Sequence, residues 1–148
     1  MKTISPRLGR LVAACAIAVV TLVAGNAAPA AAATSRNHQI YGVTGSYLGW
    51  GAWESYPVGE HRNGKMWVHD SYCDGDNGIV AALYKWTGER WSGIVNVVSV
   101  RGCGKTNTIS VKPYWEGGPE EGQGLWFRVC KLLPDGTWKG CEESFPVN

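Results

Sequence analysis

The stretch HDSYCDGDNGIV, residues 69–80, has the composition of a metal-binding loop, with three aspartates, one histidine and one cysteine in twelve positions. A calcium loop of the EF-hand type requires acidic residues at positions 1, 3 and 5, glycine at position 6 and glutamate at position 12. A loop that starts at Asp74 has Lys85 at position 12, and one that starts at Asp70 has Tyr72 at position 3. We therefore interpret the stretch as a structural turn, with a calcium site of another geometry as the alternative.

Two turn signals inside this stretch favour that interpretation. Asn77-Gly78 lies between two segments of alternating residues, and this dipeptide is a strong hairpin signal because both residues tolerate positive φ. Asp74-Gly75 offers a second turn immediately before it. The sequence therefore predicts that a hairpin connects the segments 65–70 and 79–86.

The cysteines that follow residue 33 are even in number, which in an exported chain indicates two disulfides with three possible connectivities. Between Cys130 and Cys141 lies the turn signal Pro-Asp-Gly at 134–136, which folds these two cysteines towards each other. We therefore predict the disulfide Cys130–Cys141 and, by elimination, Cys73–Cys103. The chain has no C-x2-C pair, so a four-cysteine zinc site is the disfavoured alternative, and we predict neither a metal nor a cofactor.

Aromatic residues are the most conspicuous candidates for binding, because the chain has eight tryptophans and six tyrosines. Exposed Trp and Tyr side chains stack on sugars in secreted β-modules and anchor inhibitors in enzyme clefts. The alternative is that a small sandwich fills its core with tryptophan. Trp67 and Trp126 lie opposite the more aliphatic faces of their segments, which indicates either a second core layer or an exposed platform. The candidate binding residues are Trp53, Tyr56, Trp86, Trp91 and Trp115.

Catalytic motifs are scarce. The chain has no G-x-S-x-G or H-E-x-x-H motif and no cysteine left free for a Cys–His pair. The adjacent carboxylates Glu120-Glu121 and Glu142-Glu143 would point to opposite faces of a strand, which does not suit paired acid–base chemistry. One constellation stays open, in which His69, Glu54 and Arg128 converge on a phosphate as in a small nuclease. We predict that the protein is not an enzyme.

The elements that must position these residues are strands. Helix signals are nearly absent, whereas apolar and polar residues alternate with a period of two along much of the chain. The alternation predicts strands at 65–70, 79–86, 93–100 and 125–132, and weaker strands at 38–43, 50–56, 108–112 and 137–142. Short strands at this spacing are typical of an all-β fold, and we predict an antiparallel Greek-key β-sandwich or a small barrel.

The first 33 residues have the features of a secretory signal peptide. Lys2, Arg7 and Arg10 precede the apolar run 11–25, and small residues follow it up to Ala33. We predict a signal peptide at 1–33, a loose tail at 34–37 and a single domain at 38–148. The protein is expected to be secreted and extracellular.

The charge of the chain beyond the predicted signal peptide limits its partners. Removal of residues 1–33 takes away three of the 14 Lys and Arg residues and none of the 12 Asp and Glu residues, so the net charge changes from +2 to −1. No basic run remains, and we predict no nucleic-acid binding. No later apolar run reaches the ~20 residues of a membrane span, so no membrane association is predicted after the signal is removed. We expect a monomer.

Three segments occur in a characteristic order: GKMWVHDSYCDGDNGIVAALY at 64–84, RGCGKT at 101–106, and EGQGLWFRVC at 121–130, followed by Cys141. Together they resemble a group of uncharacterised small secreted proteins of high-GC Gram-positive bacteria, over roughly residues 50–143. The resemblance implies a two-disulfide β-sandwich with the cysteine pairing given above, and it implies no activity.

The chain departs from that group in two segments, YPVGEHRNG at 56–64 and WTGERWSG at 86–93, which are longer and more aromatic. A binding surface of its own is expected there. The leading hypothesis is therefore a secreted, non-catalytic binding module that contacts a glycan or a protein surface through exposed aromatic residues. The alternative is a proteinaceous inhibitor of an extracellular hydrolase. A glycan module should present two or three coplanar rings, whereas an inhibitor should project Arg90-Trp91 or Trp115-Glu116 on a taut turn.

Overall fold

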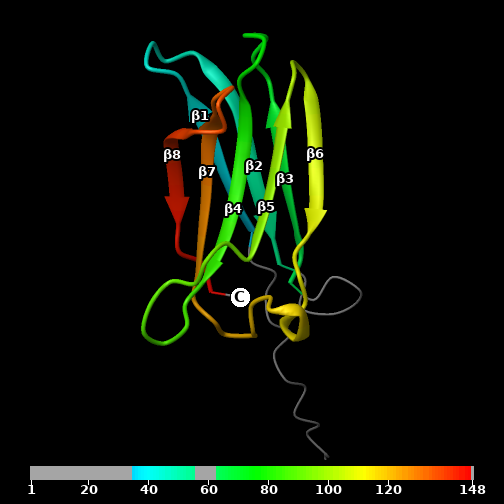
Figure 1. The fold of residues 1–148 in the computed structure, drawn as a ribbon, viewed down its shortest axis with the longest axis vertical. Coiled ribbons are helices and arrows are strands. Elements are labelled where there is room, and N and C mark those ends of the chain that lie inside the picture. The colour runs from blue at the N-terminus through cyan, green and yellow to red at the C-terminus, as the bar shows by residue number, and fades with distance from the viewer. Residues whose placement is uncertain (1–34, 56–62, 148) are drawn as a thin grey trace, which may run out of the picture.

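The computed structural model of the chain describes residues 35–55 and 63–147, and the predicted signal peptide lies outside these ranges. The described residues form two antiparallel four-stranded sheets, which face each other as the layers of a β-sandwich (Figure 1). The first sheet has the order β1 (Ser35–Tyr41), β2 (Tyr47–Glu54), β3 (Lys65–Asp70) and β6 (Lys105–Ser110). The second has the order β5 (Asn96–Arg101), β4 (Gly78–Lys85), β7 (Leu125–Leu132) and β8 (Trp138–Ser144).

The predicted all-β sandwich is confirmed, and the described part of the chain has a strand at each position where the alternation indicates one. Around the sandwich the strands follow the Greek-key order 1-2-3-6-5-4-7-8. Within the described ranges no strand pairing joins the two sheets, so the alternative of a small closed barrel is not formed. β1 begins at Ser35 because residues 35–37 pair with β2, which differs from the loose tail predicted at 34–37.

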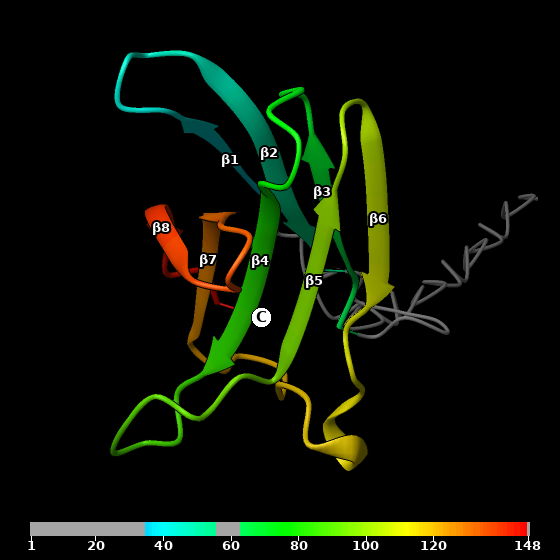
Figure 2. The same cartoon turned by 45° about the horizontal axis from the view of Figure 1, so that its top comes forward.

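The two ends of the sandwich carry different connections. The β1–β2 loop, the β3–β4 connection and the β5–β6 turn lie at one end, as both views show (Figure 2). The long β4–β5 loop and the 3-10 helix η1 (Tyr114–Glu116), which precedes β7, lie at the other end. Among the described residues no helix is long and apolar enough to cross a membrane.

The core lies between the sheets and is formed by alternate residues of the strands. The largest completely buried members are Trp53, Phe127, Ile40, Met66, Ile79, Leu83 and Leu125. Gly51 lets the sheets approach, because a Cβ atom at this position would lie 2.7 Å from Cγ1 of Val129. Since alternate residues fill the core, the intervening side chains point outwards, and the sandwich has two outer faces.

Trp53 is part of this core. Its side chain is completely buried, and its Nε1 donates a hydrogen bond to the carbonyl oxygen of Asn63 at 3.1 Å. The prediction that Trp53 is an exposed binding residue is therefore wrong. The physical reason is strand parity, since Trp53 shares the inward face of β2 with Gly49 and Gly51, and the two glycines add no side-chain bulk to that face. Tyr56, another predicted binding residue, lies outside the described residues.

The connection that contains Asn77-Gly78 is not a hairpin, so that prediction is wrong. β3 pairs with β2 and β6, whereas β4 pairs with β5 and β7, and the chain between them crosses from one sheet to the other. No non-glycine residue in the described ranges has a positive φ, so Asn77 does not adopt the conformation of a type I′ turn.

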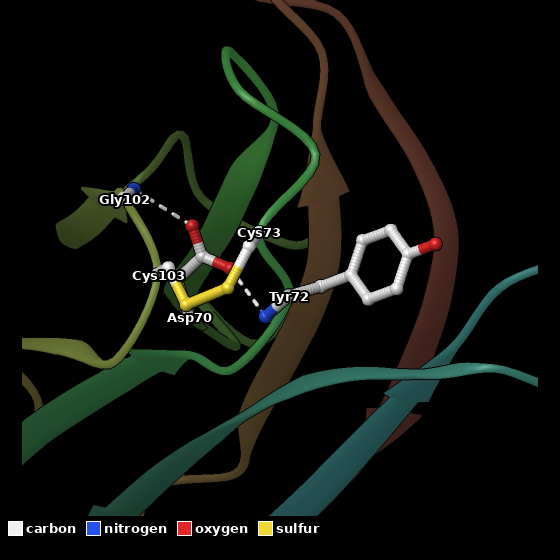
Figure 3. Close-up of a disulfide and its surroundings, with 5 residues drawn as sticks. All are labelled: Asp70, Tyr72, Cys73, Gly102 and Cys103. Atoms are coloured by element: carbon white, nitrogen blue, oxygen red, sulfur yellow. Dashed lines mark hydrogen bonds between the residues drawn. A yellow bond between two sulfur atoms is a disulfide. The ribbon is translucent and has the colours of Figure 1, made fainter.

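Asp70 holds this crossing connection in place (Figure 3). Its carboxylate is buried and accepts hydrogen bonds from the backbone N–H groups of Gly102 at 2.8 Å and Tyr72 at 3.2 Å. The carbonyl oxygen of Asp70 accepts a third hydrogen bond, from the N–H of Gly104 at 2.7 Å. One carboxylate thereby joins the end of β3 to the β5–β6 turn, and this contact explains why the stretch folds towards that turn.

Both predicted disulfides are present. Cys73–Cys103 joins the crossing connection to the β5–β6 turn, beside the Asp70 carboxylate (Figure 3). Cys130–Cys141 joins β7 to β8 on the outer face of the second sheet, where it packs with Val80 and Trp138. The turn between β7 and β8 is closed by Gly136, whose N–H donates to the carbonyl oxygen of Leu133.

Candidate functional site

Two of the predicted binding residues lie together at one end of the second sheet's outer face. Trp86, directly after β4, and Trp91 form an isolated bridge within the β4–β5 loop, and their ring centroids are 5.3 Å apart. Trp91 also contacts Trp126 of β7 at 6.0 Å and Phe145 at 5.8 Å. We name this group the Trp91 cluster, and its members are Tyr84, Trp86, Trp91, Trp126 and Phe145.

The rings of the Trp91 cluster are largely packed against one another. Tyr84 and Trp126 are opposite each other in the β4–β7 register and stack with centroids 4.6 Å apart and planes inclined by 28°. The guanidinium of Arg128 lies 5.5 Å from the Trp126 ring, and its Nε lies 3.0 Å from the Glu143 carboxylate. The rings therefore contact one another and a cation, while Trp86 and Phe145 stay exposed.

Trp115, a third predicted residue, lies on η1 and is 60% exposed. Its ring packs edge-on against Tyr114, with centroids 5.1 Å apart, and Tyr114 is itself 56% exposed. The helix projects from the sandwich at the same end as the β4–β5 loop (Figure 2). Trp115 therefore belongs to a separate projecting turn.

The most extended array of aromatic and polar side chains lies elsewhere, on the outer face of the first sheet. The strand register aligns Gln39, Trp50, His69 and Thr106 in one row across the four strands. The next row, two residues further along each strand, consists of Asn37, Ala52, Trp67 and Thr108. We name these eight residues the polar–aromatic face. All eight are exposed or half-buried, so both indoles lie at the surface.

Several contacts order the polar–aromatic face. The rings of Trp50 and His69 are nearly parallel, with centroids 5.8 Å apart and planes inclined by 22°. Nδ1 of His69 lies 2.8 Å from the hydroxyl oxygen of Thr106. The Thr108 hydroxyl donates to the carbonyl oxygen of Met66, and the Tyr41 hydroxyl donates to the side-chain oxygen of Gln39 at 2.6 Å. These contacts hold the two rows in a defined arrangement before any ligand binds.

The sequence prediction missed Trp50 as a binding residue, although a signal for it exists. Trp50 and Trp53 are three residues apart, so on one strand they point to opposite faces. On the outward face of β2, Trp50 is followed by the small Ala52, while Gly49 and Gly51 lie with Trp53 on the inward face. Trp67 was predicted to belong to a second core layer or to an exposed platform, and its half-buried position on the outer face corresponds to the platform.

The nuclease-like constellation is not formed. His69 points outwards from β3 in the first sheet, whereas Arg128 points outwards from β7 in the second, so the whole sandwich separates them. Packed sheets are about 10 Å apart, which places these two side chains beyond any common phosphate. In the parts of the chain that the structure describes, no three His, Cys, Asp or Glu side chains cluster in a way that could hold a metal ion.

One histidine lies beside a hydroxyl group at the open edge of the sandwich. His38 of β1 has its Nε2 2.9 Å from the Ser144 hydroxyl of β8, and its ring stacks on Phe127 with centroids 5.8 Å apart. To activate a serine, a histidine needs a carboxylate hydrogen-bonded to its other ring nitrogen. No described carboxylate makes such a bond to Nδ1 of His38. The contact therefore bridges the two sheets where β1 approaches β8.

The position of His38 makes the stability dependent on pH. Burial lowers the pKa of His38 from 6.5, and Arg36 lowers it further, while Glu142 partly opposes them. Because the pKa of His38 is lower in the folded chain, the unfolded chain binds a proton more readily than the folded chain does. The contribution of the neutral His38 to the free energy of unfolding is therefore complete above pH 6.5 and is lost as the pH falls through the folded-state pKa. We expect the contribution of His38 to the free energy of unfolding to fall as the pH drops below 6.5, and His38→Gln to reduce this dependence on pH. An equal dependence on pH in urea titrations of the two proteins would contradict the assignment.

No protein family, curated protein or solved structure was found that matches the chain. The two outer faces and the projecting turn are therefore the features from which a function can be proposed.

Proposed function

We propose that this protein is a secreted, non-catalytic binding module whose ligand is a glycan, bound on the polar–aromatic face. The observation that supports this best is the placement of two surface indoles, Trp50 and Trp67, among amide, hydroxyl and imidazole side chains on four adjacent strands. The two disulfides are compatible with an extracellular protein, and the predicted signal peptide is the basis for secretion.

The chemistry of this face suits a sugar. A sugar ring has an apolar C–H surface, which packs on an indole, and a periphery of hydroxyl groups, which need hydrogen-bond partners. Asn37 and Gln39 each carry an amide that both donates and accepts, and the hydroxyl oxygens of Thr106 and Thr108 accept hydrogen bonds, the Thr108 proton being donated to Met66. Removing such neutral groups from water costs far less than removing charges, so a sugar can replace their hydration at low cost.

The Trp91 cluster fits a glycan less well. Two of its ring pairs are stacked, Tyr84 with Trp126 and Trp126 with Phe145, although Trp86 and Phe145 are 38% and 63% exposed. Trp50 also stacks on His69, so the difference between the two surfaces is the amide and hydroxyl side chains that surround Trp50 and Trp67. A sugar needs an uncovered ring face with polar groups around it, and the indoles of the polar–aromatic face are surrounded by such groups.

The proposal is tested by a pull-down of the secreted protein on insoluble cellulose, chitin, xylan, mannan, pectin and peptidoglycan. We expect the protein to be retained on at least one of them. Trp50→Ala and Trp67→Ala should each weaken the retention about 30-fold, the effect of removing a central aromatic contact worth about 2 kcal/mol.

Trp86→Ala is the matched control, because Trp86 is a surface tryptophan on the opposite sheet and should leave the affinity unchanged. Circular dichroism of each variant checks the fold. Retention that survives both Trp50→Ala and Trp67→Ala, or retention on none of the polysaccharides, would contradict the proposal.

A second candidate, an inhibitor of an extracellular hydrolase, is favoured by one observation, the shape of the turn that carries Trp115. Three hydrogen bonds tighten it, from the N–H groups of Glu116, Gly117 and Gly118 to the carbonyl oxygens of residues 113 and 114. Gly117 has a φ of 87°, and a Cβ at Gly118 would collide with the backbone of residue 112. A rigid turn with an exposed Trp is the form an inhibitor presents to a cleft.

The two candidates are separated by adding the protein to a panel of secreted hydrolases. The glycan proposal expects no loss of hydrolase activity. Inhibition of one hydrolase that is relieved by Trp115→Ala, together with no retention on any glycan, would establish the second candidate instead.

A further inference from the structure

We infer that the ligand of the polar–aromatic face is an uncharged polysaccharide, bound along an internal stretch of its chain and not at its end. The inference rests on the glycan-binding function proposed above and specifies the class of glycan and the way in which it lies on the sheet.

The charge of the face carries the first part of the inference. Its two rows contain amide, hydroxyl, indole, methyl and imidazole groups and no Lys, Arg, Asp or Glu side chain. Carboxylates and sulfates on acidic glycans are recognised by arginine and lysine, preferably as bidentate pairs. Such groups are lacking in both rows.

The nearest charged pair on the same outer face reinforces this point. Glu54 and Lys65 are directly opposite each other in the β2–β3 register, one row beyond Ala52 and Trp67. Opposite charges at such positions compensate each other and leave little net field over the neighbouring rows. An acidic or a basic ligand would therefore gain no electrostatic advantage on this face.

The shape of the polar–aromatic face supports the second part of the inference, that the ligand binds along an internal stretch of its chain. Ala52 lies directly opposite Trp67 in the register and two residues from Trp50 on its own strand. Its methyl group is therefore a small side chain between two large indoles, and the surface is lower there. The two indoles are diagonal neighbours, for which the separation is about 7–8 Å. A ligand that contacts both rings extends across more than one strand and more than one row.

Both sides of the face are open. The rows end in Asn37 and Gln39 on the edge strand β1 and in Thr106 and Thr108 on the edge strand β6. These four side chains are exposed, and every residue of β6 is exposed. The side chains at the ends of both rows are exposed, so a chain that lies on the rows can continue past Asn37 on one side and past Thr106 and Thr108 on the other. A site for a chain end would need an enclosed pocket, since the terminal sugar is recognised by groups that surround it.

The test is isothermal titration calorimetry of the secreted protein with cello-, chito- and xylo-oligosaccharides, each from the monosaccharide to the hexasaccharide, and with oligogalacturonate as the acidic probe. We expect the affinity for at least one neutral series to rise more than about tenfold with length, and the acidic hexasaccharide to bind at least about tenfold more weakly. Reduction of the terminal sugar with borohydride should leave the affinity of the hexasaccharide unchanged.

Ala52→Leu places a larger side chain between the two indoles and should weaken the binding of the hexasaccharide at least about tenfold. Ser99→Leu is the matched control, because Ser99 is exposed on β5 of the other sheet and is directly opposite Val80. It should bind like the unmodified protein.

The outcomes distinguish this inference from the function on which it rests. Preference for oligogalacturonate, equal affinity for monosaccharide and hexasaccharide, or loss of binding on borohydride reduction would overturn the inference while glycan binding stands. Binding of none of these sugars and retention on none of the insoluble polysaccharides would overturn both.

Discussion

Replacement of Trp53 by alanine is expected to lower the free energy of unfolding by about 3–5 kcal/mol, the usual cost of truncating a large buried aromatic side chain. The side chain is completely buried between the two sheets, where it belongs to the core cluster with Phe127 and Met66. Its loss also removes the hydrogen bond from Nε1 to the carbonyl oxygen of Asn63. Asn63 donates in turn to the carbonyl oxygen of Lys112, so the variant should loosen a second contact.

Urea denaturation monitored by circular dichroism measures this effect. Trp86→Ala is the matched control, because Trp86 is 38% exposed and its truncation should cost no more than about 1 kcal/mol. Trp53→Phe should retain most of the stability, since it keeps an aromatic ring in the same space. A stable Trp53→Ala variant that no longer binds glycans would contradict the burial of this ring and restore Trp53 as a binding residue.

Removal of the Cys73–Cys103 disulfide by a double substitution to alanine is expected to cost about 3.5 kcal/mol. The two cysteines are 30 residues apart in sequence, and a cross-link of this span restricts the unfolded chain strongly. Cys130 and Cys141 are 11 residues apart, so their removal should cost about 3 kcal/mol. The difference also has a structural basis, because Cys130–Cys141 joins strands already paired with each other.

Urea denaturation of both double variants and of the oxidised protein checks this order. Asp70→Ala adds an independent measurement, because it leaves the disulfide intact and removes the acceptor of the Gly102 and Tyr72 N–H groups. It should destabilise by about 1 kcal/mol or more, because both hydrogen bonds are partly buried and the Asp70 acceptor itself is buried. The prediction fails if removal of Cys130–Cys141 costs clearly more than removal of Cys73–Cys103.

These two effects concern the core and the strand ends that support the polar–aromatic face. Trp53 is the inward neighbour of Ala52 on β2, Asp70 follows His69 as the last residue of β3, and Cys73 lies four residues after His69. Loss of either framework element should therefore also disturb the rows of the face. Binding assays on the stability variants are meaningful only at temperatures and urea concentrations where each variant is folded.

The amino-acid sequence by itself determined the strands and the disulfides. Alternation in KMWVHD and LWFRVCKL predicts β3 and β7 with their observed bounds, because a strand that is buried on one face must alternate. The turn at 134–136 predicts the β7–β8 hairpin and its disulfide, because both depend on residues close together in the chain. The parity of Trp50 and Trp53 is also local, since neighbours at odd spacing on a strand point to opposite faces.

Only the tertiary structure decided which of those faces is the inside. Trp53 is buried because the inward side of β2 packs on the second sheet, where Gly51 meets Val129, and no local pattern specifies that contact. In the same way, Asn77-Gly78 is a turn signal that cannot specify which strands it joins. The Asp70 carboxylate and the Cys73–Cys103 disulfide direct it across the sandwich through partners about 30 residues away. The binding face proposed above depends on such long-range pairing, which aligns Gln39, Trp50, His69 and Thr106 from four separate strands.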